Sequence, residues 1–124
     1  MDLKAATWMV RNLEQPVSMV HLTAEHDVFA GGWDGQLTRW DGEGNHLWST
    51  PTNDRISGIA LSGDAVAVAS GLHVVVLSYQ SGEVLWSAAL EGSADEVRWW
   101  QGDLVAVSSV SVSYTHIRAH ETAR

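Results

Sequence analysis

The sequence predicts an all-β fold that is built from repeated units of four short antiparallel strands. Three observations lead to this prediction. Similar segments recur about 39 residues apart along the chain. Turn residues separate short runs of apolar, β-branched and aromatic residues. The stretch from residue 15 to residue 108 lacks the helical periodicity of apolar residues.

The repeat becomes visible when two stretches of the chain are aligned. Residues 28–32 fall over residues 67–71 at an offset of 39, and Trp48 falls over Trp86 at an offset of 38. Partial copies continue the pattern at both ends, and Trp8 belongs to the first of them. We therefore read four successive copies, of which only the middle two are complete.

The two complete copies, residues 17–49 and 56–87, each contain four strand signals. We expect strands at residues 17–22, 27–31, 36–40 and 46–49 of the first copy, and at 56–61, 65–70, 74–79 and 84–87 of the second. Turns such as Asp34-Gly35 separate them. The last strand of a preceding copy is expected near residues 5–10, and the first two strands of a following copy at 94–109.

Four short antiparallel strands in each unit of about 40 residues are typical of a β-propeller blade. The predicted fold over residues 1–111 is therefore a partial β-propeller arc, with two complete blades plus flanking strands. A stack of antiparallel hairpins is the alternative. Small apolar residues on both faces of the segment 67–69 favour the propeller, because its blades are covered on both sides.

Residues 32–41, GWDGQLTRWD, resemble the WD-repeat pattern, in which a Trp-Asp pair closes the third strand. The second copy departs from that pattern, since Ser78-Tyr79 stands where Trp40-Asp41 stood. The Gly-His pair that precedes the first strand of WD repeats is missing from every copy. The hydrogen-bonded tetrad of that family therefore cannot form here in its usual way.

The segments from Gly44 to Trp48 and from Gly82 to Trp86 resemble the end of the quinoprotein-type, PQQ-like repeat. This resemblance implies that each Trp docks flat against the backbone of the neighbouring blade's glycine. The four residues would then be structural blade-docking positions. We favour the quinoprotein-type repeat over the WD repeat, and the resemblance does not imply a bound quinone.

Composition narrows the classes of partner. The formal net charge of −8 argues against a nucleic-acid backbone as the main partner. No apolar run is long enough for a membrane span. The chain has no cysteine, which excludes disulfides and cysteine-ligated metals. The absence of cysteine and of a signal peptide favours a cytoplasmic location, but the compartment stays open because we expect the chain to be truncated.

No catalytic, cofactor or metal site is readable in the sequence. The segment Asp41-x-Glu43-x-Asn45 resembles the start of a calcium loop, but its twelfth position is Thr52 where such loops carry Glu. The native histidines do not share a spacing typical of metal ligands, and they are His21, His26, His46 and His73. We therefore predict no cofactor.

Loops on a rigid scaffold are common places for recognition. In propellers the loops between blades share one face with the loops between second and third strands. A partner-binding surface is expected there, with the candidate residues Trp33, Asp34, Asn53, Asp54, Arg55 and His73. Trp33 has two interpretations, a binding anchor or packing against the adjacent blade.

The leading functional hypothesis is a non-catalytic propeller segment that acts as a protein-binding or assembly scaffold. Its partners would be a protein and the remaining blades of the parent propeller. The alternative is a fragment of a quinone-dependent dehydrogenase or another propeller enzyme whose active site lies in missing blades. Fold class alone does not decide whether the protein is an enzyme.

Residues 112–124, VSYTHIRAHETAR, resemble the translation of a sequencing-library adaptor. We therefore expect a non-native tail there, and we exclude it from the fold prediction. On this interpretation the blade array is interrupted after the second strand of the last copy.

Overall fold

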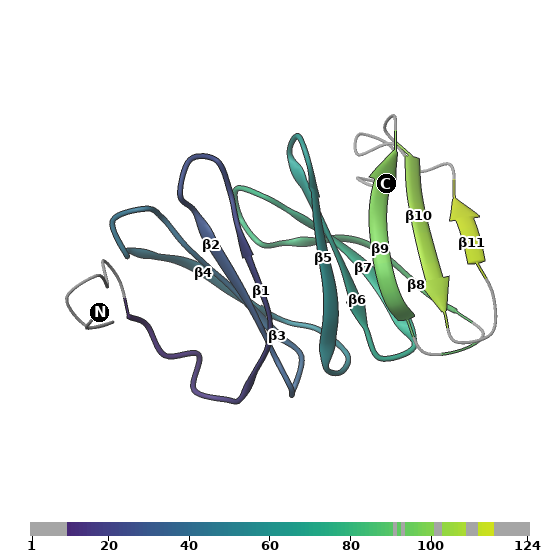
Figure 1. Cartoon of the computed structure of the whole chain (residues 1–124), viewed down its shortest axis with the longest axis horizontal. Coiled ribbons are helices and arrows are strands. Elements are labelled where there is room, and N and C mark those ends of the chain that lie inside the picture. The colour runs from purple at the N-terminus through teal and green to yellow at the C-terminus, as the bar shows by residue number, and fades with distance from the viewer. Residues whose placement is uncertain (1–9, 91, 93, 101–102, 109–111, 116–124) are drawn as a thin grey trace, which may run out of the picture.

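The computed structural model describes residues 10–90, 92, 94–100, 103–108 and 112–115 (Figure 1). This part of the chain consists of β-strands and connecting turns. It contains no helix long and apolar enough to cross a membrane. The strand expected near residues 5–10, with Trp8, lies outside the described residues except for Val10, which is not in a strand.

Three antiparallel sheets follow one another along the chain, and we call them blades 1, 2 and 3. Blade 1 has the order β1 (Val17–Leu22), β2 (Val28–Gly32), β3 (Gln36–Trp40), β4 (His46–Pro51). Blade 2 has the order β5 (Ile56–Ser62), β6 (Ala65–Ser70), β7 (His73–Ser78), β8 (Val84–Ala89). Blade 3 comprises β9 (Ala94–Trp100), β10 (Asp103–Ser108) and β11 (Val112–Thr115).

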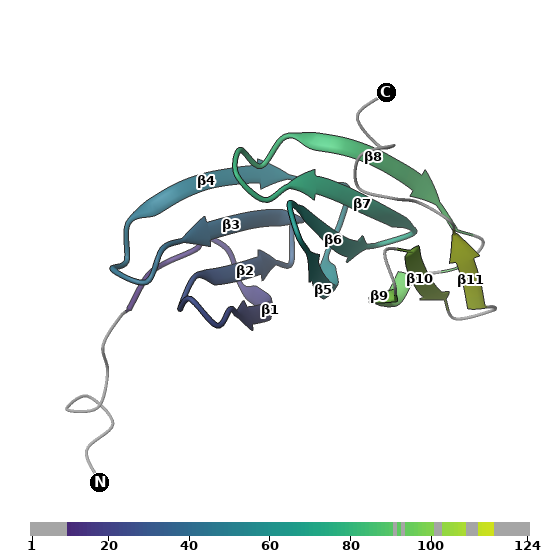
Figure 2. The same cartoon turned by 90° about the horizontal axis from the view of Figure 1, so that it is seen from above.

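The sheets stand side by side as an arc, with β1, β5 and β9 along one rim and β4 and β8 along the other (Figure 2). Neighbouring strands within each blade pair in sequence order, as in a meander. This arrangement confirms the predicted fold class, an all-β partial propeller with two complete four-stranded blades. The ends of the strands in blades 1 and 2 differ from the predicted ends by no more than two residues.

The hydrophobic core lies between blades, not within one sheet. Strand β6 shows why, because all six of its residues are buried. Its side chains alternate between the two faces of the sheet. Val66 and Val68 join the cluster shared with blade 1, which includes Phe29. Ala67 and Ala69 join the cluster shared with blade 3. Each blade therefore depends on its neighbours to bury its apolar faces.

Serine hydroxyls tie the inner strands of successive blades together. Ser18 Oγ donates to the carbonyl of Ile56, with 2.6 Å between the oxygens. One blade further on, Ser57 Oγ donates to the carbonyl of Ala94 over 2.7 Å. The same hydrogen bond therefore recurs at both blade junctions, although the sequence comparison had not singled out either serine.

The strand register corrects the sequence alignment of the second strands. Val20 pairs with Ala30 in blade 1, and the corresponding Ile59 pairs with Val68 in blade 2. The offset between blades is thus 39 at the first strand but 38 at the second. Five residues separate the paired Leu22 and Val28 in blade 1, whereas four separate the corresponding pair, Leu61 and Val66, in blade 2, and this extra residue shifts the offset.

The register also corrects the alignment of the WD-like segment. Trp40 pairs with the first residue of β4, and Leu77 pairs with the first residue of β8. Leu77-Ser78 therefore stands opposite Trp40-Asp41, whereas the sequence alignment had placed Ser78-Tyr79 there. Tyr79 lies in the turn after β7. Six residues separate the paired Leu77 and Val84, whereas five separate the paired Trp40 and His46 of blade 1.

Strand β11 lies within residues 112–124, the segment that the sequence assigned to a non-native tail. It pairs antiparallel with β10, and Val107 lies opposite Val112. Blade 3 therefore has a third strand where two were expected. Backbone groups on an open sheet edge accept any segment with suitable alternation, so the pairing does not depend on the segment's origin. That origin stays a prediction, and residues 116–124 lie outside the described residues.

Trp48 of blade 1 docks against the backbone of blade 2. Its side chain is 7% exposed, and its indole Nε1 donates to the carbonyl of Tyr79 over 2.9 Å. Its ring lies against Gly82, where a Cβ atom would overlap the indole carbons. Thr50 Oγ1 donates to the carbonyl of the same glycine. The close approach of the two blades at this point therefore requires a residue without a side chain.

The other docking positions have different surroundings. Gly44, the counterpart of Gly82, has the guanidinium of Arg11 against it, and its carbonyl accepts a hydrogen bond from Arg11 Nε over 2.8 Å. Trp86 is half-buried and packs against the cluster shared by blades 2 and 3. The sequence contains no glycine after Gly102 that could correspond to Gly82.

Gly82→Ala should destabilise the fold more than Gly63→Ala. Both glycines have positive φ, +76° and +53°, so both variants carry the backbone penalty of a left-handed alanine. Only the methyl group at position 82 would meet the Trp48 ring, because nothing lies within 4 Å at position 63. We expect an additional loss of about 1–3 kcal/mol in the free energy of unfolding. Equal losses in denaturant titrations of the two variants would contradict the docking contact.

Candidate binding face at the inter-blade loops

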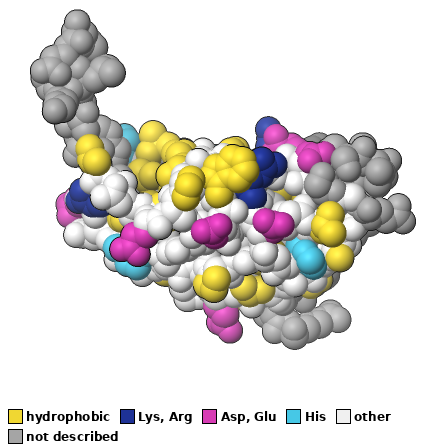
Figure 3. Space-filling model, turned by 90° about the horizontal axis from the view of Figure 1, so that it is seen from below, with side chains coloured by type: hydrophobic (Ala, Val, Ile, Leu, Met, Phe, Trp, Pro, Cys, Tyr) yellow, Lys and Arg dark blue, Asp and Glu magenta, His cyan; other side chains and the backbone are white. Residues whose placement is uncertain are grey.

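Four connections lie at one end of the sheets, which we call the loop face. They are the turns after β2 (residues 33–35), β4 (52–55), β6 (71–72) and β8. Antiparallel order brings these turns to the same end, since every second connection of a meander returns to the same side. Figure 3 views the molecule from this end, where apolar side chains lie next to basic and acidic ones.

Backbone hydrogen bonds join these loops to one another. Thr52 N donates to the carbonyl of Gly35 over 2.8 Å, and Gly71 N donates to the carbonyl of Arg55 over 3.2 Å. Leu90 N donates to the carbonyl of Leu72 over 2.7 Å. The loop face is therefore a connected surface, not a set of independent turns.

The hydroxyl of Ser70 fixes the loop between blades 1 and 2. It is fully buried, accepts a hydrogen bond from Asp54 N and donates to the carbonyl of Asp54. Thr52 Oγ1 lies 2.9 Å from the same hydroxyl. The carboxylate of Asp54 accepts a hydrogen bond from the backbone N–H of Arg55. These contacts hold the backbone at position 55 in place.

Trp33 and Arg55 form the most prominent contact on the loop face. The Arg55 guanidinium carbon lies 4.9 Å from the centroid of the Trp33 ring, a cation–π arrangement. Trp33 is nevertheless 50% exposed, and Leu72 in the next blade is 54% exposed. A groove of about 360 Å³ runs between these side chains, lined by Trp33, Asp54, Arg55, Ser57, Gly71, Leu72 and Ala94.

The structure brings together three of the six residues that the sequence nominated, since Trp33, Asp54 and Arg55 line one groove. Asp34 is exposed beside Trp33, and Gln15 Oε1 accepts a hydrogen bond from its backbone N–H over 2.8 Å.

The remaining two nominated residues, Asn53 and His73, lie outside that groove. Asn53 is exposed in the same loop as Arg55. His73 is half-buried as the first residue of β7. Leu72 was not nominated, although it lies in the turn that corresponds to the Trp33 turn, and that correspondence was the available signal.

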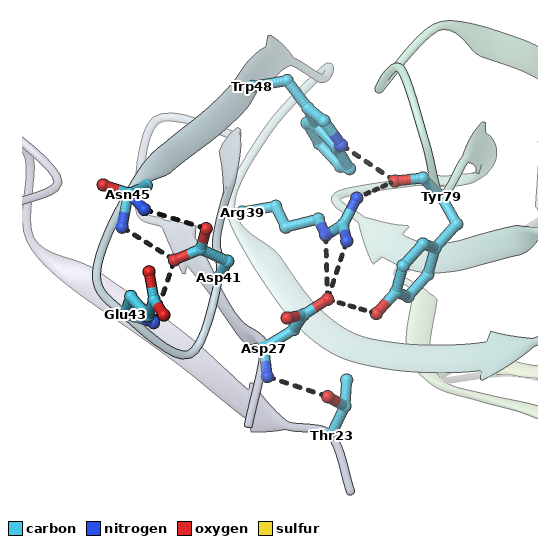
Figure 4. Close-up of polar contacts among 8 residues, drawn as sticks. All are labelled: Thr23, Asp27, Arg39, Asp41, Glu43, Asn45, Trp48 and Tyr79. Atoms are coloured by element: carbon cyan, nitrogen blue, oxygen red, sulfur yellow. Dashed lines mark hydrogen bonds and ion pairs between the residues drawn. The ribbon is translucent and has the colours of Figure 1, made fainter. Parts of the chain in front are cut away.

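A cluster of polar side chains between blades 1 and 2, which we call the polar centre, was not predicted from the sequence (Figure 4). Arg39 Nη2 lies 2.7 Å from Asp27 Oδ2, and Arg39 Nη1 donates to the carbonyl of Tyr79 over 2.9 Å. The Tyr79 hydroxyl donates to the same Asp27 oxygen over 2.6 Å. The guanidinium carbon also lies 4.1 Å from the centroid of the Tyr79 ring. Blade 1 therefore supplies an ion pair that holds a tyrosine of blade 2.

The environment of Tyr79 raises its pKa above the usual value of 10.0, first through burial and then through its hydrogen bond to the Asp27 carboxylate. By strand register, Ala65 and Val76 of blade 2 occupy the places of Asp27 and Arg39. The polar centre is thus not repeated at the junction of blades 2 and 3. A search for repeats could not detect it, because its members belong to only one copy.

The segment that resembled the start of a calcium loop closes a turn in the structure. Asp41 Oδ1 accepts hydrogen bonds from the backbone N–H groups of Glu43 and Asn45, each over 2.9 Å (Figure 4). These bonds, above all those from Asn45, lower the pKa of the Asp41 carboxyl. In the described part of the chain, no group of three or more His, Asp or Glu residues is placed to hold a metal ion.

Comparison with known proteins gives one curated relative and several structural ones. No protein-family model matches the chain. Immune protein Tsi7 of Pseudomonas aeruginosa is 27% identical over 97 residues, which make up 76% of this chain and 31% of that protein. The chain thus spans about a third of the length of this curated relative.

The solved structures that resemble the chain are β-propellers. The β-propeller domain of Cps50 (Swd1) from Myceliophthora thermophila has a TM-score of 0.70 at 17% identity, over 80% of this chain and 34% of that one. The designed protein Ika8 has a TM-score of 0.74 at 19% identity, over 82% and 33%. BamB from Moraxella catarrhalis has a TM-score of 0.64 at 16% identity, over 73% and 28%. At these identities the similarity shows the fold, which is that of a β-propeller.

Tyr79→Phe should lower the free energy of unfolding by about 1.5 kcal/mol at neutral pH, because it removes a hydrogen bond to a charged group. The raised pKa of Tyr79 means that the folded state holds its proton more tightly than the unfolded state. This contribution is present below pH 10 and is lost as the pH rises through the folded-state pKa. The stability gap between the two proteins should therefore narrow above pH 10.

Urea unfolding of both proteins at pH 8 and pH 11 measures this gap. Tyr114→Phe, which removes the other tyrosine of the chain, is the control. A gap that stays the same at both pH values would count against the assigned role of the Tyr79 hydroxyl.

Proposed function

We propose that the chain is part of a non-catalytic β-propeller scaffold that binds a protein partner through its loop face. The observation that carries this proposal is the half-exposed Trp33, whose ring stacks with Arg55 beside a groove at the blade junction. Trp and Arg are the residue types most often responsible for affinity in protein interfaces. A Trp needed only for packing would be expected to lie buried against the next blade, as Trp48 does.

The rigidity of the loop face supports a binding role. Its backbone is fixed by the buried hydroxyl of Ser70 and by hydrogen bonds between neighbouring loops. A surface that is already ordered loses little conformational entropy when a partner binds. The groove lining contains one carboxylate, one guanidinium and one hydroxyl, together with apolar groups. This composition suits recognition of a protein segment.

The quinoprotein-type repeat is the repeat family we propose, and the contact between Trp48 and Gly82 supports it. That contact is what the resemblance implied for the end of each blade. The name of the curated relative, an immune protein, suggests the biological setting in which a partner would be sought. The proposal does not extend to a quinone, for which no residue of the groove offers a specific argument.

Site-specific photocrosslinking of the full-length protein tests the proposal. A photoreactive residue at position 33 should crosslink a partner protein in cells, whereas the same residue at position 64, an exposed turn at the opposite end of blade 2, should not. The captured protein is then purified and titrated against the wild type and Trp33→Ala. We expect the variant to bind about 30-fold more weakly, which corresponds to a loss of about 2 kcal/mol.

Equal crosslinking at positions 33 and 64, or unchanged affinity of Trp33→Ala, would overturn the assignment of the binding face. A quinone absorbance band in the purified full-length protein would overturn the non-catalytic role and favour the dehydrogenase alternative. The two measurements are independent of each other.

A further inference from the structure

The Trp33 ring already holds one cation. The Arg55 guanidinium lies 4.9 Å from the ring centroid, and yet half of the Trp33 side chain stays exposed. An indole has two faces of equal electron density, and each attracts a cation. The remaining exposed surface of the ring is therefore suited to a second cationic group supplied by a partner.

Two exposed carboxylates neighbour Trp33 and Arg55 in the sequence, and one of them, Asp54, also lines the groove. Asp34 follows Trp33 directly, Asp54 precedes Arg55, and both side chains are exposed. Within the part of the chain that the structure describes, ion pairs form at Arg39–Asp27 and Arg98–Glu96 and do not involve these two carboxylates. The two residues of the Trp33–Arg55 contact thus have two acidic neighbours in the sequence, and the whole chain carries a net charge of −8.

Blades 2 and 3 contribute mainly apolar residues to the groove. Leu72 is 54% exposed, Gly71 and Ala94 also line the groove, and Ser57 adds a hydroxyl. The Asp54 side chain lies against Gly71. Figure 3 shows apolar and acidic side chains next to one another on this face. An occupant that matches both Asp54 and Leu72 combines a positive charge with an aliphatic group a short distance away.

An acidic occupant would have to pair with Arg55. That guanidinium is already stacked on Trp33, and an incoming carboxylate would enter a groove that Asp54 also lines, in a chain with a net charge of −8. Like charges brought together at an interface oppose binding, whereas opposite charges speed association and fix the orientation of the partner. The charge distribution around the groove therefore favours a basic occupant.

From these observations we infer that the partner presents a basic protein segment, with an Arg or Lys over Trp33 between Asp34 and Asp54 and an aliphatic residue against Leu72. This inference rests on the proposed function and makes it more specific. It identifies the occupant by chemistry, as a peptide segment in which a cationic residue lies close to Leu, Ile or Val.

Selection of displayed random nine-residue peptides on the immobilised full-length protein tests the inference. The wild type should enrich peptides with Arg or Lys near Leu, Ile or Val, and their binding should weaken as salt is raised. Asp34→Asn/Asp54→Asn should bind these peptides about tenfold more weakly, a loss of about 1.4 kcal/mol. The matched control Glu43→Gln/Asp64→Asn changes the charge equally at exposed turns of the opposite end, and it should bind them as the wild type does.

A third variant, Trp33→Ala, distinguishes a failure of the basic-occupant inference from a failure of the proposed binding face. The basic occupant is overturned if the enriched peptides need Trp33 but are acidic or neutral. It is also overturned if they need Trp33 but bind the Asp34→Asn/Asp54→Asn variant as they bind the wild type. Neither result contradicts the proposed binding face. Peptides that bind Trp33→Ala as well as the wild type, or a selection without enrichment, overturn both. Equal weakening in the two double variants would show a general charge effect and would also overturn the inference.

Discussion

The packing of one blade on the next is the constraint on which the rest of this structure depends. A four-stranded sheet with apolar residues on both faces cannot bury them by itself, and β6 is covered by blade 1 on one side and blade 3 on the other. Trp48 against Gly82, and the serine hydroxyls of Ser18 and Ser57, set how closely the sheets approach. Stability in such an array comes from neighbouring units.

The same packing places the loop face. Because each blade begins and ends at fixed positions relative to its neighbour, the turn that carries Trp33 lies next to the loop that carries Arg55. Ser70 then fixes the loop backbone through hydrogen bonds that are shielded from water. The result is an ordered groove lined by residues from different blades. Such a groove suits binding because its loops lose little conformational entropy when a partner binds.

The junction of blades 1 and 2 contains a polar centre, formed by Asp27, Arg39 and Tyr79, that the next junction lacks. An ion pair buried between sheets needs all of its hydrogen bonds in order to offset the loss of hydration. Here Tyr79 and its carbonyl supply the remaining partners. At the following junction Ala65 and Val76 fill the corresponding places with apolar contacts. The corresponding positions are therefore polar at the junction of blades 1 and 2 and apolar at the junction of blades 2 and 3.

The sequence by itself determined the blade: the spacing of Trp48 and Trp86, the turn residues and the alternation in β6 were sufficient for the strand order and the propeller class. Local pattern carries this information because strand periodicity and turn chemistry are properties of neighbouring residues. Only the tertiary structure decided the one-residue shift between repeats, the partnership of Asp27 with Tyr79, and the meeting of Trp33 with Arg55. The two side-chain contacts join residues 52 and 22 positions apart, and one sequence without repeated copies of such contacts does not encode them in its pattern.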